Sequence, residues 1–183
     1  MAAGKSNTST SSAAAVPLPL IYRLFFLTIE PFSALVGAYF AHFQPAEYLR
    51  LTTYPPSVTT SLPAPQPSPT TRIVLSQLAN LYLLFALNEA LVLRATADRR
   101  VWRALLFGLL VADVGHLYSV WGLWTAGKAV YWDVGGWNAM DWGNVGFVYV
   151  GMSMRVAFLM GVGMGEGSGR GKRKGAGRGK KGD

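Results

Sequence analysis

The sequence predicts an all-α fold: an integral membrane four-helix bundle with both termini in the cytosol. The chain has 51% hydrophobic and only 14% charged residues, whereas soluble domains average about 25% charged residues. Its apolar residues form four stretches of about 20 residues each, the length a helix needs to cross a bilayer. The basic residues flanking these stretches gather on one side of the expected membrane, which indicates the orientation.

The apolar stretches and the breaks between them set the domain boundaries. The transmembrane domain is expected at 20–163, with spans at 20–43, 73–93, 102–124 and 144–162. Residues 1–19 and 164–183 are expected to be disordered because they are polar and low in complexity. Residues 44–72 hold seven prolines, so this loop is expected to be extended and exposed rather than helical.

Positive charge is concentrated at one face of the expected membrane. With both termini cytosolic, thirteen basic residues fall inside, and only Arg50, Arg72 and Lys128 fall outside, as the positive-inside rule requires. Seven of the 17 basic residues lie in the last 14 positions, and this tail is expected to contact anionic lipid head groups. Nucleic acid is not an expected partner, because the membrane-embedded body presents no basic surface.

Ionisable side chains interrupt every expected span. They are Glu30, Glu89, Asp113 with His116, and Arg155. A charge at the bilayer centre costs about 3 kcal/mol or more, so such residues usually face a protein interior and have a partner or a function. We therefore expect a polar cluster inside the bundle.

Depth along each span predicts which of these side chains meet. At a rise of about 1.5 Å per residue, Arg155 comes within reach of Asp113 and Glu30 near mid-membrane. The same reasoning pairs Arg23 with Glu89 nearer the cytosolic face, where Asn88 adds a polar side chain. These pairs would fix how the helices meet, or would line a functional pocket; the sequence leaves both open.

Small residues at four-residue intervals predict where helices approach closely. One such stripe lies on the first span and another on the third: Ser33, Gly37 and Ala41, and Gly108, Ala112, Gly115 and Ser119.

No cofactor or metal site is expected. The chain has no cysteine and only two histidines. His42 is expected near the non-cytosolic end of the first span, whereas His116 is expected inside the third. Nucleotide-binding and hydrolase motifs are absent. Lys180 and Lys181, third and fourth from the C-terminus, look like the dilysine retrieval signal of endoplasmic-reticulum membrane proteins.

Two resemblances can be stated. The segments Tyr22–Phe26, Ile29–Pro31, Gly37–Tyr39 and His42–Pro45, with Asn88-Glu89 and Asp113–His116, resemble a family of small multi-pass fungal membrane proteins of unassigned function. The general plan is also similar to the EXPERA group, which includes sterol Δ8–Δ7 isomerases and sterol-binding membrane proteins. That similarity implies a pocket for a sterol-like molecule.

Two functions therefore compete. In the first, the chain binds or isomerises a sterol- or terpenoid-like lipophile, with Glu30 and Asp113 as catalytic acid and cation stabiliser and His116 relaying protons. It predicts an apolar cavity, open sideways to lipid, with Glu30 and Asp113 on its wall. In the second, the chain is a scaffold of an endomembrane complex, and it predicts a closed bundle with paired charges. Whether the chain is an enzyme, and whether it oligomerises, stays open.

Overall fold

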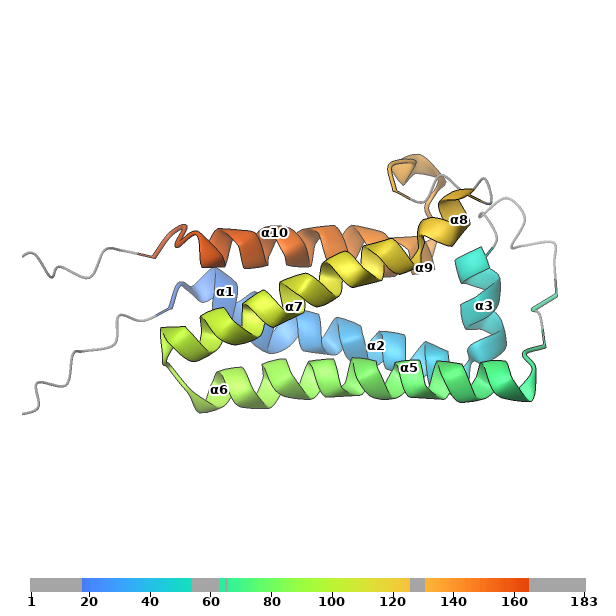
Figure 1. The fold of residues 1–183 in the computed structure, drawn as a ribbon, viewed down its shortest axis with the longest axis horizontal. Helices are drawn as coiled ribbons and strands as arrows, with labels where there is room; N and C mark the ends of the chain where they lie inside the picture. Colours follow the sequence, from blue (N-terminus) through green and yellow to red (C-terminus); the bar gives the residue numbers. More distant parts are fainter. Residues whose placement is uncertain (1–17, 54–62, 65, 126–130, 165–183) are drawn as a thin grey trace, which may run out of the picture.

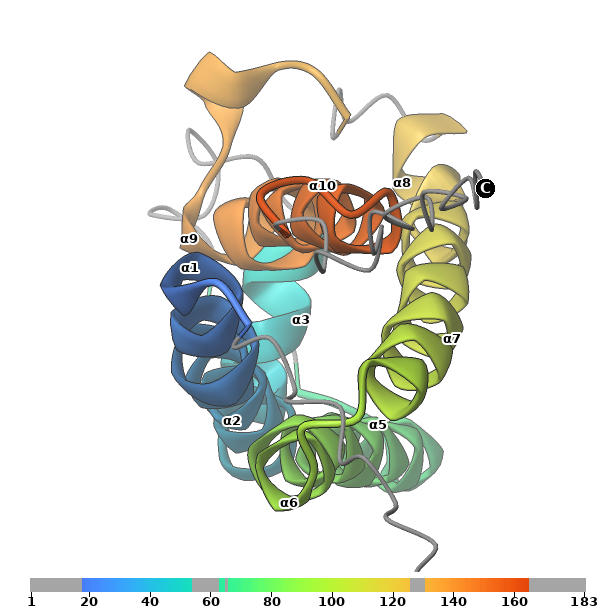
Figure 2. The same cartoon turned by 90° about the vertical axis from the view of Figure 1, so that its left-hand side faces the viewer.

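The computed structural model describes residues 18–53, 63–64, 66–125 and 131–164. Within these ranges the regular structure is helical and contains no strand, which confirms the all-α class. Long helical segments run side by side, and α3 crosses one end of them (Figures 1 and 2). Residues 1–17 and 165–183, which carry the expected N-terminal segment and basic tail, lie outside the described residues.

The first segment is one continuous helix interrupted by a π-helical turn. It comprises α1 (Leu20–Leu24), η1 (Phe25–Ile29) and α2 (Glu30–Phe43). Pro31 has no N–H to donate to the carbonyl of Leu27, its partner in a regular α-helix. That carbonyl instead accepts a hydrogen bond from Arg94 Nη2 at 2.5 Å. A local irregularity of the first segment is therefore tied to the end of the second.

The prediction of an extended loop at 44–72 is wrong at both ends of that range. Helix α3 (Pro45–Thr53) lies within it, and α5 begins at Pro69. Both prolines occupy the first helical position, where the missing N–H has no intrahelical acceptor to satisfy and the fixed φ suits a helix. Ser68 caps α5 by accepting from the N–H of Thr71 at 3.1 Å. The prediction from proline content therefore missed the starts of two helices.

The second and third segments are longer than expected. The second comprises α5 (Pro69–Leu87), η2 (Asn88–Val92) and α6 (Leu93–Ala95); the third comprises α7 (Arg99–Ser119) and α8 (Trp121–Thr125). Asp98 caps α7 by accepting from the N–H of Arg100 at 2.8 Å. In the turn between the segments, Trp102 Nε1 donates to the carbonyl of Thr96 at 2.9 Å.

The last segment follows a short 3₁₀ turn, η3 (Val134–Gly136). It comprises α9 (Ala139–Asp141), η4 (Trp142–Gly146) and α10 (Phe147–Leu159). Asn138 and Asp141 form a reciprocal capping box at its start. The segment ends at Leu159, Gly161 beyond it has a φ of +80°, and the N–H of Val162 donates back to the carbonyl of Ala157 at 2.9 Å. This left-handed glycine closes the helix as a Schellman motif does.

Three helices in the described part of the chain are long and apolar enough to cross a membrane: Leu20–Phe43, Pro69–Ala95 and Arg99–Leu123. The fourth expected span is not among them. Its helical residues run from Ala139 to Leu159 and include Asn144 and Arg155, which lower its hydropathy. The chain thus has the character of a membrane protein, with a less apolar fourth segment.

The segments pack as two pairs. α2 lies along α5, and α10 lies along α7. On α2, Ala41 is buried beside Leu75 and Ala79 of α5, so this small-residue stripe does face another helix. The stripe on α7 does not: a Cβ added at Gly108 or Gly115 would meet nothing within 4 Å.

The largest apolar core lies at the end of the bundle where α1, α6 and the C-terminus of α10 meet (Figure 1). It is rich in aromatic side chains: Tyr22, Phe25, Phe26, Leu93, Trp102, Leu106, Leu109 and Phe158. Two side chains of this end also bond to carbonyls at and just beyond the end of α10. Tyr22 Oη donates to Val162 at 2.8 Å, and Arg103 Nη1 donates to Leu159 at 2.8 Å.

Candidate functional site

Arg155 of α10 occupies the centre of the bundle. Its Nη1 donates to Asp113 Oδ2 of α7 at 2.7 Å. Its Nη2 donates to Glu30 Oε1 of α2 at 2.5 Å and to Glu89 Oε1 of η2 at 3.3 Å. One guanidinium therefore joins all four long segments, and we call these four residues the Arg155 cluster.

The Arg155 cluster is buried. Arg155 and Glu89 are 0% exposed, Glu30 5% and Asp113 6%. The guanidinium carbon also lies 5.4 Å from the ring centre of Phe85, a cation–π distance. Three carboxyl groups share one cation, so the charges balance only when two of the carboxyls carry a proton. Such a cluster is costly to bury unless each group keeps its partners.

Local helix geometry sets the position of the acids. η1 ends immediately before Glu30, and η2 begins with Asn88 and contains Glu89. A π-helical turn inserts an extra residue, so it rotates the side chains that follow relative to a regular helix, and it occurs often at functional sites. η4 likewise precedes α10. Three of the four long segments therefore contain a π-helical turn near the site. The spacing of residues along a regular α-helix does not predict such turns.

Gly151 provides the room that the cluster needs. It lies one turn before Arg155 on α10, and a Cβ at this position would lie 2.7 Å from Arg155 Nη1 and 3.1 Å from Glu30 Oε1. Real Cβ atoms do not approach so closely, so a larger residue would displace the guanidinium. The glycine thus belongs to the site although it carries no side chain.

The structure corrects the expected pair of Arg23 and Glu89. Arg23 is exposed on α1, whereas Glu89 is fully buried and bonds to Arg155. The second segment ends at Ala95 rather than near residue 93, and its π-helical turn changes the direction of Glu89. Asn88 is half-buried at the start of that turn.

His116 lies near the Arg155 cluster but bonds elsewhere. Its Nε2 is 3.0 Å from the backbone carbonyl oxygen of Asn144, in η4. Because a carbonyl can only accept, Nε2 is assigned as the protonated ring nitrogen. This bond orients the ring between α7 and η4. A direct relay from His116 to a cluster carboxyl is not among the hydrogen bonds of the described residues.

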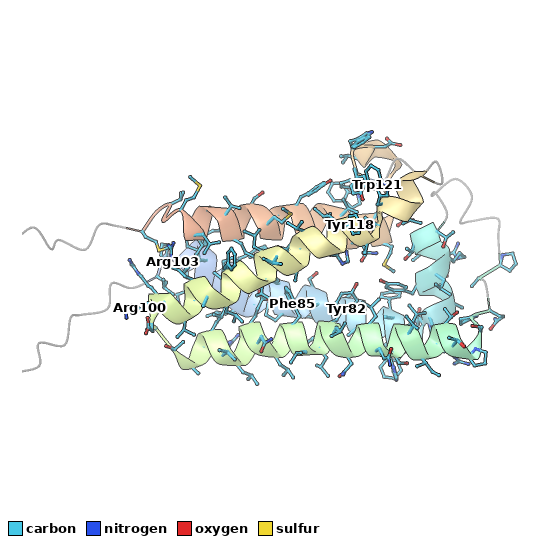
Figure 3. The ribbon with its side chains drawn as sticks, in the orientation of Figure 1. Tyr82, Phe85, Arg100, Arg103, Tyr118 and Trp121 are labelled. Carbon is cyan, nitrogen blue, oxygen red and sulfur yellow. The ribbon has the colours of Figure 1, made fainter. Side chains whose placement is uncertain are left out.

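A cavity of about 500 Å³ adjoins the cluster. Glu30, Asp113 and His116 lie on its wall, and the rest of the lining is mostly apolar or small, including Phe40, Tyr82, Phe85, Ala112, Gly115, Phe147 and Val148. Glu89 and Arg155 are not part of the lining. Figure 3 shows Tyr82 and Phe85 rising from α5 toward α7. The size matches pockets that hold small molecules, about 300–1,000 Å³.

Short helices close one end of this cavity. Leu51 of α3 and Ala139 and Met140 of α9 line it there. Asn138 Nδ2 donates to the carbonyl of Leu51 at 2.7 Å, which ties the start of α9 to α3. The Arg155 cluster lies toward the opposite end, so the cavity runs from a cap of short helices to a polar floor.

The side of the cavity lies between α5 and α7. These two helices diverge from their shared turn, as both ribbon views show (Figures 1 and 2). Leu81 on α5 and Ala112 and Gly115 on α7 line the cavity and are also exposed on the molecule's surface. An opening at this side would face lipid in a membrane rather than water.

Sequence reasoning missed Tyr82 and its partner Tyr48. Their hydroxyl oxygens lie 3.3 Å apart, and Tyr82 both lines the cavity and touches the position of Gly37. A tyrosine far from a membrane interface was the available signal, because tyrosine in membrane helices favours the interfaces. The described residues contain no group of His, Cys, Asp and Glu arranged to hold a metal ion.

Comparison with known proteins gives a family but no activity. A model of the DUF7704 family, a domain of unknown function, matches residues 15–165. The chain belongs to this family. Neither a curated protein nor a solved structure matches the chain. The matched range includes every member of the Arg155 cluster and the whole cavity lining, so the site lies within the DUF7704 domain of this chain.

Proposed function

We propose that this DUF7704 domain is a four-span endomembrane protein that binds a lipophilic molecule of sterol or terpenoid size between α5 and α7. The observation that carries the proposal is the cavity with Glu30 and Asp113 on its wall. A mostly apolar lining with a few convergent polar groups is the usual form of a small-molecule site. A ligand of low water solubility would enter from the bilayer through the α5–α7 side.

The proposed orientation places the α6–α7 turn and both termini in the cytosol. Arg100 and Arg103 lie together at this end of α7, while Tyr118 and Trp121 lie toward its other end (Figure 3). Basic residues favour the cytosolic side and aromatic residues favour interfaces. The basic tail would contact anionic head groups, and Lys180 and Lys181 would retain the protein in the endoplasmic reticulum.

Binding is better supported than isomerisation. A double-bond shift would need one carboxyl to add a proton to an alkene carbon while another group removes a proton from a neighbouring carbon. Glu30 and Asp113 both bond to Arg155 instead, and His116 bonds to Asn144. These contacts hold the polar groups in place, which suits the anchoring of a ligand's polar end.

A second candidate, a scaffold role, is favoured by one observation. Arg155 contacts carboxyls from three other segments, and buried charges can specify which helices meet. The two candidates differ in what they require of the cavity. A scaffold needs the cluster but no occupant beside it.

A matched pair of substitutions on α7 separates them. Gly108 and Gly115 are both exposed, and a Cβ at either would meet nothing within 4 Å. Only Gly115 lines the cavity. We expect Gly115→Trp to fill the cavity from its side and Gly108→Trp to leave it empty of protein atoms.

The measurement is native mass spectrometry and lipid extraction of the full-length protein purified in detergent. The proposal expects one lipophile bound per chain in the unmodified protein and in Gly108→Trp, and its loss in Gly115→Trp. Recovery of bulk phospholipid alone, in equal amounts from all three proteins, would reject ligand binding and leave the scaffold role.

A further inference from the structure

We propose, resting on the function above, that the cavity takes its ligand from one leaflet of the membrane only: the leaflet on the side of α3 and α8, away from the α6–α7 turn. In the proposed orientation this is the non-cytosolic leaflet. The ligand is then a lipophile resident in that leaflet, and molecules in the cytosolic leaflet have no direct way into the cavity.

The cavity lies on one side of the membrane's middle. At least ten residues separate every lining residue of the four long segments from the end of its segment at the α6–α7 turn, as Glu30 from Leu20 and Phe85 from Ala95 show. Ten residues of helix rise about 15 Å, half of the roughly 30 Å of hydrocarbon in a bilayer. Counted from the turn, the cavity therefore extends from the middle of the membrane outward.

The bundle is closed between the cavity and the α6–α7 turn. Leu93 of α6 and Trp102 of α7, each 1% exposed, belong to one core cluster, so apolar side chains fill the space between the second and third segments there. At the inner edge of this core, Arg155 bonds to Glu89 of the second segment and to Asp113 of the third. A molecule in the leaflet at this end meets packed side chains instead of an opening.

Beyond the Arg155 cluster, α5 and α7 belong to separate cores. Leu75 of α5 is in a cluster with Ala41 of α2 and Tyr48 of α3, whereas Val120 after α7 is in a cluster with Val145 of η4. No core cluster of the described residues joins α5 to α7 at this end. The cavity has residues of both helices in its wall, and it separates the two cores.

Exposed wall residues on both helices mark the opening. Ala112, Gly115 and Ser119 of α7 line the cavity and are exposed, and Leu81 of α5 lines it and is 61% exposed. These α7 positions share one helix face, and from 112 to 119 the helix rises about 10 Å. α7 is therefore a packed helix near the turn and one edge of an opening beyond the Arg155 cluster.

The two ends of α7 identify the leaflet that borders this opening. Arg100 and Arg103 lie at the turn, and Tyr118 and Trp121 lie at the other end (Figure 3). Aromatic residues favour the membrane interfaces, so the opening at 112–119 lies between the middle of the membrane and the interface opposite the turn. A lipophile that moves sideways from that leaflet enters without crossing the midplane.

A phospholipid confined to one leaflet tests the inference on the full-length protein. The probe is phosphatidylcholine with a diazirine midway along one acyl chain, loaded into the outer leaflet of vesicles that contain the protein. Its charged head group keeps it there, because charges cross the bilayer centre at high cost. The protein is first depleted of bound lipophile with cyclodextrin. Irradiation attaches the probe to the residues it touches, and mass spectrometry locates them.

A tag joined to Asp183 through a site for a specific protease sorts the two orientations in the vesicles. α10 ends at the α6–α7 turn, where Arg103 Nη1 donates to the carbonyl of Leu159, so protease added outside removes the tag only from chains whose turn faces outward. Chains that keep the tag present their α3 side to the probe. We expect label on the cavity wall in these chains only.

Particular residues report the two outcomes. Tyr82 and Phe147 line the cavity and are only half-exposed, so label on them reports a probe chain inside the opening. Phe107 is 59% exposed in the turn-side half of α7 and lines no part of the cavity. In cleaved chains we expect label on Phe107 and its loss from Tyr82 and Phe147, which shows that the probe reached the helix but found no opening.

Two substitutions on α7 give a matched test of the route. A Cβ at Gly108 or at Gly115 would meet nothing within 4 Å, but only Gly115 borders the opening. We expect Gly115→Trp to abolish wall label in the chains that keep the tag and Gly108→Trp to preserve it. The unmodified protein decides between the leaflets even if Gly115→Trp does not fold.

The outcomes separate the leaflet from the function. Wall label in the cleaved chains, in both classes of chain or in neither would overturn one-leaflet access, as would wall label that survives Gly115→Trp. A co-purified lipophile would still uphold the proposed function in each case. Wall label from the expected leaflet that excess cholestanol and farnesol do not reduce, with no lipophile recovered by extraction, would uphold the opening and overturn the proposed function instead.

Discussion

Arg155 Nη1 and Asp113 Oδ2 lie 2.7 Å apart, and this hydrogen bond joins α10 to the middle of α7. α7 diverges from α5 (Figure 1), so its position beside the cavity depends on its contact with α10. Asp113 itself lies on the cavity wall. The ion pair between α10 and α7 therefore also fixes the position of a residue of the cavity wall.

Replacing Arg155 with leucine should be among the most destabilising single changes. It would leave three buried carboxyls without their common cation, and breaking a buried ion pair in this way costs about 3–5 kcal/mol. The control is Phe32→Leu, because Phe32 is 69% exposed on a face that lipid would cover. The measurement is the thermal midpoint of the detergent-purified protein, followed by fluorescence-detected gel filtration. Equal midpoints for the two variants would contradict the central role of Arg155.

Gly151→Ala should disturb the Arg155 cluster through size alone. The new methyl group would lie 2.7 Å from Arg155 Nη1, so the guanidinium must shift, and overpacking of this kind costs about 1–3 kcal/mol. Gly108→Ala is the control, since its methyl group would meet nothing within 4 Å. In an Arg155→Leu background the penalty of Gly151→Ala should shrink, because the clashing atom is gone. An unchanged penalty there would show that the steric argument is wrong.

Much of this architecture was available from the sequence because burying a charge in lipid is so costly. Apolar length located the long helices, and depth along them brought Arg155 to Asp113 and Glu30. The position of Glu89 could not be obtained in the same way. Glu89 lies within a π-helical turn. Such a turn changes the direction in which each later side chain points, and the amino-acid composition does not reveal it.

Helix α3 and the α7 stripe show two other limits. A proline-rich stretch reads as extended, yet proline is favoured at the first helical position, so Pro45 and Pro69 start helices instead of preventing them. Gly115 and its neighbours on α7 read as a packing surface, yet they line a cavity. Small residues allow two helices to pack closely, but close packing occurs only where a second helix lies against that face.

A pH dependence is expected at α3, outside the expected spans. The hydrogen bond from Arg50 lowers the pKa of the Glu47 carboxyl from its usual value of 4.5. When folding lowers the pKa of a carboxyl, the pair contributes its full stabilisation above the unfolded-state pKa. This stabilisation is lost as the pH falls through the folded-state pKa. Glu47→Gln should therefore cost about 0.3–1 kcal/mol at pH 7 and less at pH 3, which lies below the usual pKa of the carboxyl. Thermal midpoints at the two pH values test this, and a penalty independent of pH would refute it.

The proposed orientation can be checked at Asn7. Asn7-Thr8-Ser9 is a glycosylation sequon, and with a cytosolic N-terminus it should stay unmodified. A sequon introduced at residues 126–128, between the third and fourth expected spans, is the matched positive control, because that connection would face the lumen. Glycosidase-sensitive mobility shifts on gels report both sites. Glycan on Asn7 would invert the assignment of inside and outside.

Arg94 and Pro31 should be coupled energetically although they do not bond to each other. Pro31 cannot donate to the carbonyl of Leu27, and Arg94 Nη2 does so in its place. Arg94→Met should therefore cost about 1 kcal/mol, whereas Arg100→Met at the same end of the bundle should stay within about 0.5 kcal/mol of the unmodified protein.

The double-mutant cycle isolates this relationship. Pro31→Ala restores an N–H that can satisfy the Leu27 carbonyl within the helix, so Arg94→Met should become nearly neutral in that background. Thermal midpoints of the four proteins give the coupling free energy. A penalty of the same size with proline and with alanine at position 31 would mean that Arg94 acts through its charge at the membrane surface, because the surface attraction does not depend on whether Leu27 has another donor.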